Sequence, residues 1–531
     1  MLSNDFFKNL LDEMINLKGY FIIYFVLLSA FIISQEFFYN INFKGILFET
    51  FLLFLLGCLL LLFITKKDLP IHKVAFLIIL IFGLCCVFIT PTVLVPDEYE
   101  HFLRSELTSK GEFFPNYVTT PNTNKTGYES KGYETIYSLV SLSKDAGKSG
   151  ESISLMSDVD KGTVFQMDWD DKPINYESGY VDSVFAQNPF YGYIPQAIGI
   201  DIAKGLCLNN IWMLWFGRLC NLLFYVLICS YAVKKAPIYK TALLVTACLP
   251  ITIFEAASLS IDASVNALLI LSISYFLYLY KKEAKTITWK DLSIFSIILL
   301  LSSLTKLTYL ALALLIFLIP KDKFKSINTR YLSGCYFLIV SLITIIWSRY
   351  ATRALLNSWR YIHNLNCNVN SHIQLIYILT NPYKYLTMLL NLDTFKGIVK
   401  TFFSFCVIPD YSVLFMLIFI IVFIIFCLSY PSKNKIKKNT KISLLIISLL
   451  VYFGTLTVQY LTYSPVYSTV SLGVQARYFI PLIAFAPMIF SINNTDYYNY
   501  KKTGWIRLVY ILIVAFLSIL LLTLLTNFYN F

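Results

Sequence analysis

The sequence predicts an all-α integral membrane protein with about thirteen transmembrane helices and one large loop on the outer face. Three observations support this fold class. The 531 residues are 57% hydrophobic and only 14% charged, whereas soluble domains carry roughly 25% charge. Apolar windows of about 20 residues, long enough to cross a hydrocarbon core, recur along the chain. Lysines gather in alternate connectors between these windows, as expected for cytoplasmic loops.

The apolar windows define the predicted spans and the topology. They cover residues 19–36, 45–64, 72–90, 210–232, 241–259, 261–280, 291–304, 306–320, 331–350, 407–430, 441–461, 476–492 and 507–527. With the N-terminus inside, every lysine-rich connector lies on the cytoplasmic side. The first eighteen residues are amphipathic and lack a signal-peptide cleavage pattern, which predicts targeting by uncleaved spans. We therefore expect a multi-pass protein of the cell (cytoplasmic) membrane.

The windows divide the chain into five parts. These are an N-terminal amphipathic segment with three spans (1–90), a large extracytoplasmic loop (91–188), core spans (189–350), a second extracytoplasmic segment (351–406) and C-terminal spans (407–531). The large loop holds 16 acidic and 8 basic residues, so it contains about half of the 31 carboxylates. Its beginning, Asp97 to Lys110, has apolar residues at helical spacing after Pro96, which predicts an interfacial helix.

Composition and missing motifs exclude several classes of function. The net charge of +12 comes from the cytoplasmic lysine clusters, so it indicates contact with the lipid bilayer and not nucleic-acid binding. The sequence has neither a Walker-type phosphate loop nor a Rossmann fingerprint. A nucleotide-linked substrate is therefore not expected, and no histidine pair has metal-site spacing.

The strongest local signal is the acidic motif directly after the third window. Asp97 and Glu98 stand at the predicted membrane boundary, where a partly desolvated carboxylate can take a proton from an acceptor hydroxyl. The alternative is a solvated helix start, because acidic residues favour the N-terminal end of a helix. His101 follows in the same motif and is a candidate substrate-binding residue. The alternative is a packing or capping role, which is more common for a lone histidine.

A second acidic motif forms a tight outer turn between two windows. Glu255, Ser258 and Asp262 offer carboxylates and a hydroxyl that could bind sugar hydroxyls or hold a divalent cation such as Mg²⁺ or Mn²⁺. The alternative is an interfacial turn with polar caps. Because Glu255 lies deeper than a turn requires, the functional interpretation is favoured.

Six cations on the outer side run against the positive-inside rule. They are Arg218, Lys306, Arg349, Arg353, Arg360 and Arg477. A phosphate or pyrophosphate would provide their counter-charge, since arginine binds phosphate in a bidentate fork. Pairing with the acidic loop or contact with lipid headgroups are the alternatives. We expect at least two of the six to contact a phosphate.

Four segments together resemble a known family. They are Pro96–Arg104 (PDEYEHFLR), Asn188–Gln196 (NPFYGYIPQ), Ala257–Asp262 (ASLSID) and Gly473–Pro481 (GVQARYFIP). They are similar to the successive signature segments of a bacterial family of polytopic membrane proteins of unknown function, often encoded beside surface-polysaccharide genes. That family resembles the GT-C glycosyltransferases. The resemblance spans about residues 75–490. Its segments contain further candidate substrate-binding residues, which are Arg104, Tyr193, Gln196, Gln475 and Tyr478. Tyr193 could stack on a sugar ring, and the alternative for it is a place in the aromatic belt of the interface.

The GT-C resemblance implies an outer-face glycosyltransferase. Such an enzyme takes a sugar from a polyprenyl-phosphate donor in the bilayer and transfers it, with inversion, to a glycan acceptor such as a cell-surface polysaccharide or a teichoic-acid-like polymer. The pattern from Asp97 to Phe102 also resembles the first outer loop of protein mannosyltransferases, which implies Asp97 as catalytic base with Glu98 in support. Ala476 stands where the family has glycine, so substrate choice can differ.

Two other functions are compatible with the same pattern. Many spans and a cationic cavity also suit a flippase or exporter of lipid-linked sugars, but transporters usually bind near the membrane midplane and here the charges cluster on one side. A non-catalytic scaffold of a polysaccharide assembly complex would keep the same spans. The sequence favours the glycosyltransferase over both.

Overall fold

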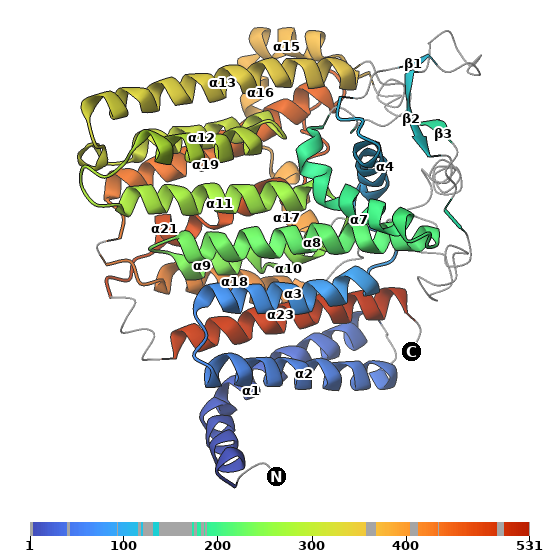
Figure 1. The fold of residues 1–531 in the computed structure, drawn as a ribbon, viewed down its shortest axis with the longest axis vertical. Coiled ribbons are helices and arrows are strands. Elements are labelled where there is room, and N and C mark those ends of the chain that lie inside the picture. Colours follow the sequence, from blue (N-terminus) through green and yellow to red (C-terminus); the bar gives the residue numbers. More distant parts are fainter. Residues whose placement is uncertain are drawn as a thin grey trace.

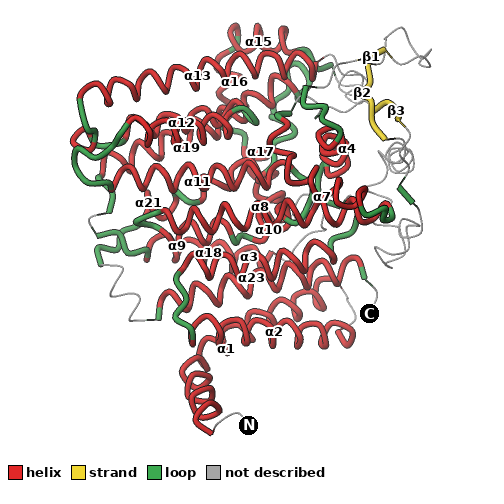
Figure 2. Tube along the Cα trace, viewed as in Figure 1, coloured by secondary structure: helices red, strands yellow, loops and turns green. Residues whose placement is uncertain are grey.

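The computed structural model describes residues 4–39, 43–92, 94–114, 118–119, 131–136, 173–174, 178–181, 185, 188–356, 368–403, 413–433, 435–495 and 504–529. This part of the chain is nearly all helical, and its long helices lie side by side across the molecule (Figure 1). A small antiparallel sheet of β1 (Val118–Thr119), β2 (Lys131–Ile136) and β3 (Ser178–Val181) lies at one edge (Figure 2). The sheet belongs to the large loop and, within the described residues, departs from the all-α prediction.

Eight described helices are long and apolar enough to cross a membrane. Their bounds are α1 (Asn4–Tyr39), α2 (Phe43–Lys66), α3 (Ile71–Ile89), α8 (Asn210–Lys235), α11 (Ile261–Lys281), α13 (Ile327–Leu356), α19 (Lys438–Thr462) and α23 (Trp505–Phe528). Each corresponds to one predicted window. The apolar window of α11 is 94% buried, against 17% in α13, so α11 is central and α13 is peripheral.

The other five predicted windows fold as shorter elements. They contain α9 (Lys240–Ala247) with α10 (Pro250–Ala256), α12 (Trp289–Ser303), the 3₁₀ helix η2 (Leu307–Leu318), α18 (Val413–Ser429), and η4 (Ala476–Phe479) with α20 (Ile480–Ile483) and α21 (Ala486–Phe490). Prolines stand at the starts of α10, α20 and α21, where a missing N–H interrupts the helical ladder. The expected count of spans thus exceeds the eight full-length helices.

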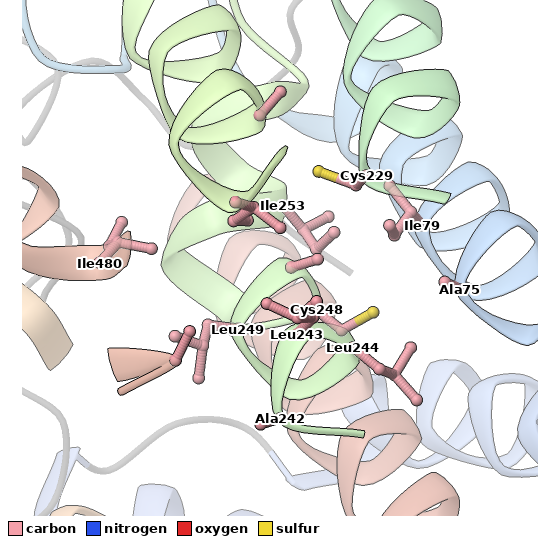
Figure 3. Close-up of a cluster of buried hydrophobic side chains, with 14 of the residues drawn as sticks. Ala75, Ile79, Cys229, Ala242, Leu243, Leu244, Cys248, Leu249, Ile253 and Ile480 are labelled. Atoms are coloured by element: carbon pink, nitrogen blue, oxygen red, sulfur yellow. The ribbon is translucent and has the colours of Figure 1, made fainter. Parts of the chain in front are cut away.

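The break between α9 and α10 is stabilised inside the core. The Tyr225 hydroxyl donates to the Ala247 carbonyl at 2.9 Å, and Thr252 Oγ1 donates to the Thr246 carbonyl at 3.2 Å. Buried carbonyls released by the break therefore keep partners, as a membrane core demands. Figure 3 shows the apolar side chains around it, among them Leu243, Leu244, Cys248 and Leu249.

One end of the bundle gathers several short elements, and we call it the α4 end after α4 (Glu98–Ser109). Around it lie η1 (Phe190–Tyr193), α7 (Ile194–Gly205), α15 (Ser371–Thr380), α16 (Pro382–Leu389) and α17 (Leu392–Phe403) (Figure 1). The short η3 (Lys321–Lys323) lies in a connector at the opposite end. Helix α7 packs closely on α8, because a Cβ on Gly199 would lie 2.1 Å from the Phe216 carbonyl oxygen.

Helix α4, expected after Pro96, is present and is packed inside the protein. Glu98, Glu100, His101, Arg104 and Glu106 are all buried. Its polar side chains contact α7, α8 and the turn before α11, so protein contacts cover this helix. Its expected position along the membrane interface stays a prediction.

Candidate functional site

Asp97 and Glu98 are adjacent in sequence but point into different surroundings. Asp97 caps α4 in a left-handed backbone conformation with φ of 62°, which Asp tolerates better than most residues. Its side chain remains 44% exposed, whereas the Glu98 side chain is 1% exposed. The turn at Asp97 therefore presents one carboxylate to the surroundings and sends the next one into the bundle.

Arg477, from η4, is the centre around which the acidic motifs meet. Its Nη2 donates to Asp97 Oδ2 at 2.6 Å, and its Nε lies 3.1 Å from Asp262 Oδ2. Its Nη1 lies 3.6 Å from Glu255 Oε1 and donates to the Pro96 carbonyl at 3.1 Å. The guanidinium is 2% exposed, so it is a buried cation surrounded by three carboxylates from three segments.

Lys306 completes this group at its edge. Its Nζ donates to Asp262 Oδ1 at 2.8 Å and lies 3.7 Å from the centre of the Tyr478 ring. The Tyr309 hydroxyl holds the Tyr478 backbone through a 3.0 Å bond to its carbonyl. The Lys306 side chain is 27% exposed. We call Asp97, Glu255, Asp262, Lys306 and Arg477 the acid–base cluster.

The cluster does not provide the cation site that Glu255 and Asp262 suggested. Both Asp262 oxygens face Lys306 and Arg477, and Glu255 faces Arg477, so protein cations occupy the positions that Mg²⁺ or Mn²⁺ would take. Among the described residues, no group of three or more His, Cys, Asp and Glu is placed to hold a metal ion.

A second charged pair, Glu98 with Arg218, is buried, and every N–H group of its arginine is hydrogen-bonded within the protein. Arg218 Nε and Nη2 donate to the two Glu98 oxygens at 2.7 and 2.6 Å, the bidentate geometry that arginine favours. The other N–H groups of Arg218 donate to the carbonyls of Val87, Thr90 and Pro91. Glu98 also accepts from the Leu259 N–H at 3.2 Å. This pair, the Glu98–Arg218 clamp, joins the end of α3 to α4, α8 and the turn before α11.

Arg104 forms another closed contact within the loop. It is fully buried and donates to Thr108 Oγ1 and to the carbonyls of Glu112, Phe113 and Asn188. Arginine has five N–H donors, and these bonds use all of them. Arg104 therefore fastens the two ends of the large loop to each other, which is a structural task.

Amide side chains fix the turn between α10 and α11. Asn221 Nδ2 donates to the carbonyls of Ser258 and Ser260 at 2.8 and 3.0 Å, and Gln196 Nε2 donates to Leu259 and Ser260 at 3.4 and 3.5 Å. Ser258 Oγ donates to the Glu255 carbonyl at 2.7 Å. Gln196 and Ser258 thus shape the backbone that carries Glu255 and Asp262, although both were expected to bind substrate.

His101 is enclosed by side chains. Its Nδ1 lies 2.8 Å from the Tyr193 hydroxyl, its Nε2 lies 3.4 Å from Ser260 Oγ, and Phe185 stacks on the ring at 4.6 Å. Burial lowers the pKa of His101 to about 3, and burial also raises the pKa of Tyr193. Both groups are therefore neutral at physiological pH, and neither is exposed to a ligand.

The family model described as a predicted membrane protein (DUF2142) matches residues 80–486. The chain belongs to this family. No curated protein and no solved structure matches the sequence. The match to DUF2142 and the eight candidate spans establish a multi-pass membrane protein, and the matched range contains both acidic motifs, the Glu98–Arg218 clamp and Arg477.

Some predicted site residues of this DUF2142 member stand apart from the cluster. Arg349 is exposed on α13. Arg360 lies outside the described residues, and so does the side chain of Arg353. Gln475 directly precedes η4, and its Oε1 is buried. The structure therefore unites Asp97, Glu255, Asp262, Lys306, Arg477 and Tyr478, and it assigns Arg104 and Arg218 to structural contacts.

Sequence reasoning missed two residues that shape the site, Asn221 and Tyr309. Asn221 follows Arg218 by three positions on α8, so the two polar side chains share one helical face. A pair of polar residues at that spacing within an apolar span was a usable signal. Tyr309 offered none, because tyrosine is common near membrane boundaries.

Proposed function

We propose that this protein is an outer-face glycosyltransferase of the GT-C type. It moves a sugar from a polyprenyl-phosphate donor to a cell-surface glycan acceptor, with inversion at the anomeric carbon. The observation that carries the proposal is the acid–base cluster, in which the partly exposed Asp97 contacts a buried cation drawn from a distant segment. Costly buried charges at the end of an apolar bundle suggest a function by default.

The arrangement of lysines supports the outer position of the cluster. Lys66, Lys235 and Lys281 lie in the last turns of α2, α8 and α11, which is the end opposite α4 (Figure 1). Lysine clusters stay on the cytoplasmic side, so the α4 end is extracytoplasmic. Counting the shorter apolar elements as passes gives about thirteen spans and the same orientation.

Asp97 is the catalytic base of this proposal. The acceptor hydroxyl oxygen attacks the anomeric carbon, its proton passes to Asp97, and the bond from that carbon to the phosphate oxygen breaks with its electron pair leaving on the phosphate. Asp97 is the most exposed carboxylate of the cluster, since Glu255 and Asp262 are 1% and 6% exposed. Only a carboxylate within hydrogen-bond reach of the acceptor can take its proton.

Lys306 is the cation that meets the departing phosphate. Arg104 and Arg218 have every N–H engaged by carbonyls, hydroxyls or Glu98, and Arg477 faces three carboxylates. Among the described residues, Lys306 forms an ion pair with one carboxylate, that of Asp262, and retains exposed surface. A fixed cation beside the leaving oxygen stabilises the charge that develops in the transition state.

The proposal is tested with purified protein, a panel of polyprenyl-phosphate hexoses and a glycan acceptor. Wild-type protein should form glycosidic product, and Asp97→Asn should lose it. Asp393→Asn is the matched control, because Asp393 is an exposed carboxylate of α17 at the same end, with a 76% exposed side chain. Lipid-linked sugar crossing vesicle membranes without any product would support a flippase and contradict the proposal.

A further inference from the structure

His101 sits between two walls of the site, and its surroundings fix its hydrogen bonds. The Tyr193 hydroxyl accepts from Asn188 Nδ2 at 3.1 Å, so its own proton is directed to His101 Nδ1 at 2.8 Å. A neutral imidazole that accepts at Nδ1 carries its proton on Nε2. This proton points to Ser260 Oγ at 3.4 Å.

Ser260 transmits this bond to the acid–base cluster. It is the N-cap of α11, and its Oγ accepts from the Asp262 N–H at 3.1 Å. The hydroxyl oxygen has two lone pairs, which matches the two donors, His101 Nε2–H and Asp262 N–H. Asp262 in turn holds Lys306 and Arg477. A short chain of bonds thus joins Tyr193 to the cations of the cluster.

We propose that His101 is a positioning residue which, as a neutral Nε2–H imidazole, holds the Ser260 cap and thereby the Asp262 carboxylate that orients Lys306 and Arg477. Only the expected change in kcat rests on the proposed function. The hydrogen-bond state of His101 is a property of the folded protein alone. It also replaces the expectation that His101 touches substrate, because the ring is 2% exposed and covered by Phe185.

The charges that face His101 are balanced. Asp97 on its own helix and Asp262 on α11 favour the imidazolium, while Arg477 from η4 and Lys306 oppose it, and burial decides the outcome by lowering the pKa to about 3. His101 therefore keeps one protonation state over the physiological range of pH.

Two amide variants of His101 distinguish the role of ring nitrogen Nδ1 from that of Nε2. In His101→Gln the longer amide reaches the position of Nε2 and can still donate to Ser260. In His101→Asn the shorter amide reaches only the position of Nδ1 and the bond to Ser260 is lost. We expect His101→Gln to retain kcat within about threefold and His101→Asn to lose at least about tenfold in kcat, about 1.4 kcal/mol, with an unchanged KM for the donor.

A second measurement is independent of activity. In histidine-¹⁵N-labelled protein in detergent, the signal missing from His101→Gln should report a neutral Nε2–H imidazole from about pH 5 to pH 8. An imidazolium or an Nδ1–H tautomer would overturn the inference, and so would equal kcat values for the two variants or a change in KM alone. If wild-type protein forms no product while the spectrum shows the Nε2–H state, the proposed function fails and the assigned state of His101 stands.

Discussion

The Glu98–Arg218 clamp and the acid–base cluster lie side by side at the α4 end, yet they differ in how their charges are satisfied. In the clamp, one arginine meets one carboxylate and three carbonyls, and both side chains are at most 1% exposed. In the cluster, three carboxylates share two cations, and Asp97 and Lys306 keep exposed surface.

Within the acidic motif after α3, this difference distinguishes a residue that stabilises the fold, Glu98, from one that can take part in a reaction, Asp97. A closed pair has no free donor or acceptor for a substrate, so its contribution is to hold α3, α4, α8 and the turn before α11 together. An open group retains atoms that can bind and exchange protons. The outer arginines Arg104 and Arg218 therefore stabilise the fold, whereas Lys306 keeps exposed surface that can contact an anion.

Breaking the clamp should give the largest effect. Arg218→Leu leaves Glu98 buried without its partner, which costs about 3–5 kcal/mol of folding free energy, and we expect a large fall in thermal stability in detergent. The double variant Glu98→Leu with Arg218→Leu should recover part of that loss, since no unpaired charge remains. Lys396→Leu is the control, because the Lys396–Asp393 pair is exposed and surface pairs contribute little.

Opening the cluster at Lys306 should affect turnover more than folding. Lys306→Gln removes the cation proposed to stabilise the departing phosphate, and the loss of one such group lowers the rate by about 10²-fold. Steady-state kinetics with a polyprenyl-phosphate hexose measures the change. Lys384→Gln on α16 serves as control. A rate within twofold of wild type would remove Lys306 from the mechanism.

The packing that supports the clamp can be perturbed without touching a charge. A Cβ at Gly199 would press on the Phe216 carbonyl next to Gly217 and Arg218, and such overpacking costs about 1–3 kcal/mol. Gly199→Ala should therefore lower the melting temperature. Gly205→Ala in the same helix meets nothing within 4 Å and should leave it unchanged.

A smaller effect concerns pH. Because the folded-state pKa of His101 is lowered to about 3, below its unfolded value of roughly 6.5, its contribution to stability is complete above about pH 6.5 and is lost as the pH falls. We expect unfolding to become easier below that pH by up to about 1.4 kcal/mol per pH unit. Denaturant unfolding of His101→Gln should show a shallower decline, and identical slopes would contradict the buried neutral state.

The sequence predicts the helical membrane fold and the shared side of the charges, because hydropathy and lysine placement are local signals. It places Asp97, Asp262 and Arg477 at the same end of the protein. It does not distinguish the role of Arg477 from that of Arg218. Tertiary contacts alone determine that the carbonyls of residues 87, 90 and 91 accept hydrogen bonds from Arg218. Nor does the sequence reveal the left-handed turn at Asp97, which packing determines. The helix breaks at prolines 250, 481 and 487 did have a local signal, because proline removes a backbone N–H from a helix.

Asp97 and Glu98 are adjacent acidic residues with opposite roles, and one paired measurement tests this most directly. Turnover and thermal stability are measured together for Asp97→Asn and Glu98→Gln. We expect Asp97→Asn to keep wild-type stability and to lose at least about 10²-fold in turnover, whereas Glu98→Gln is destabilised and any folded fraction still turns over. An Asp97→Asn protein that is fully active, or a stable Glu98→Gln protein that is inactive, would contradict it.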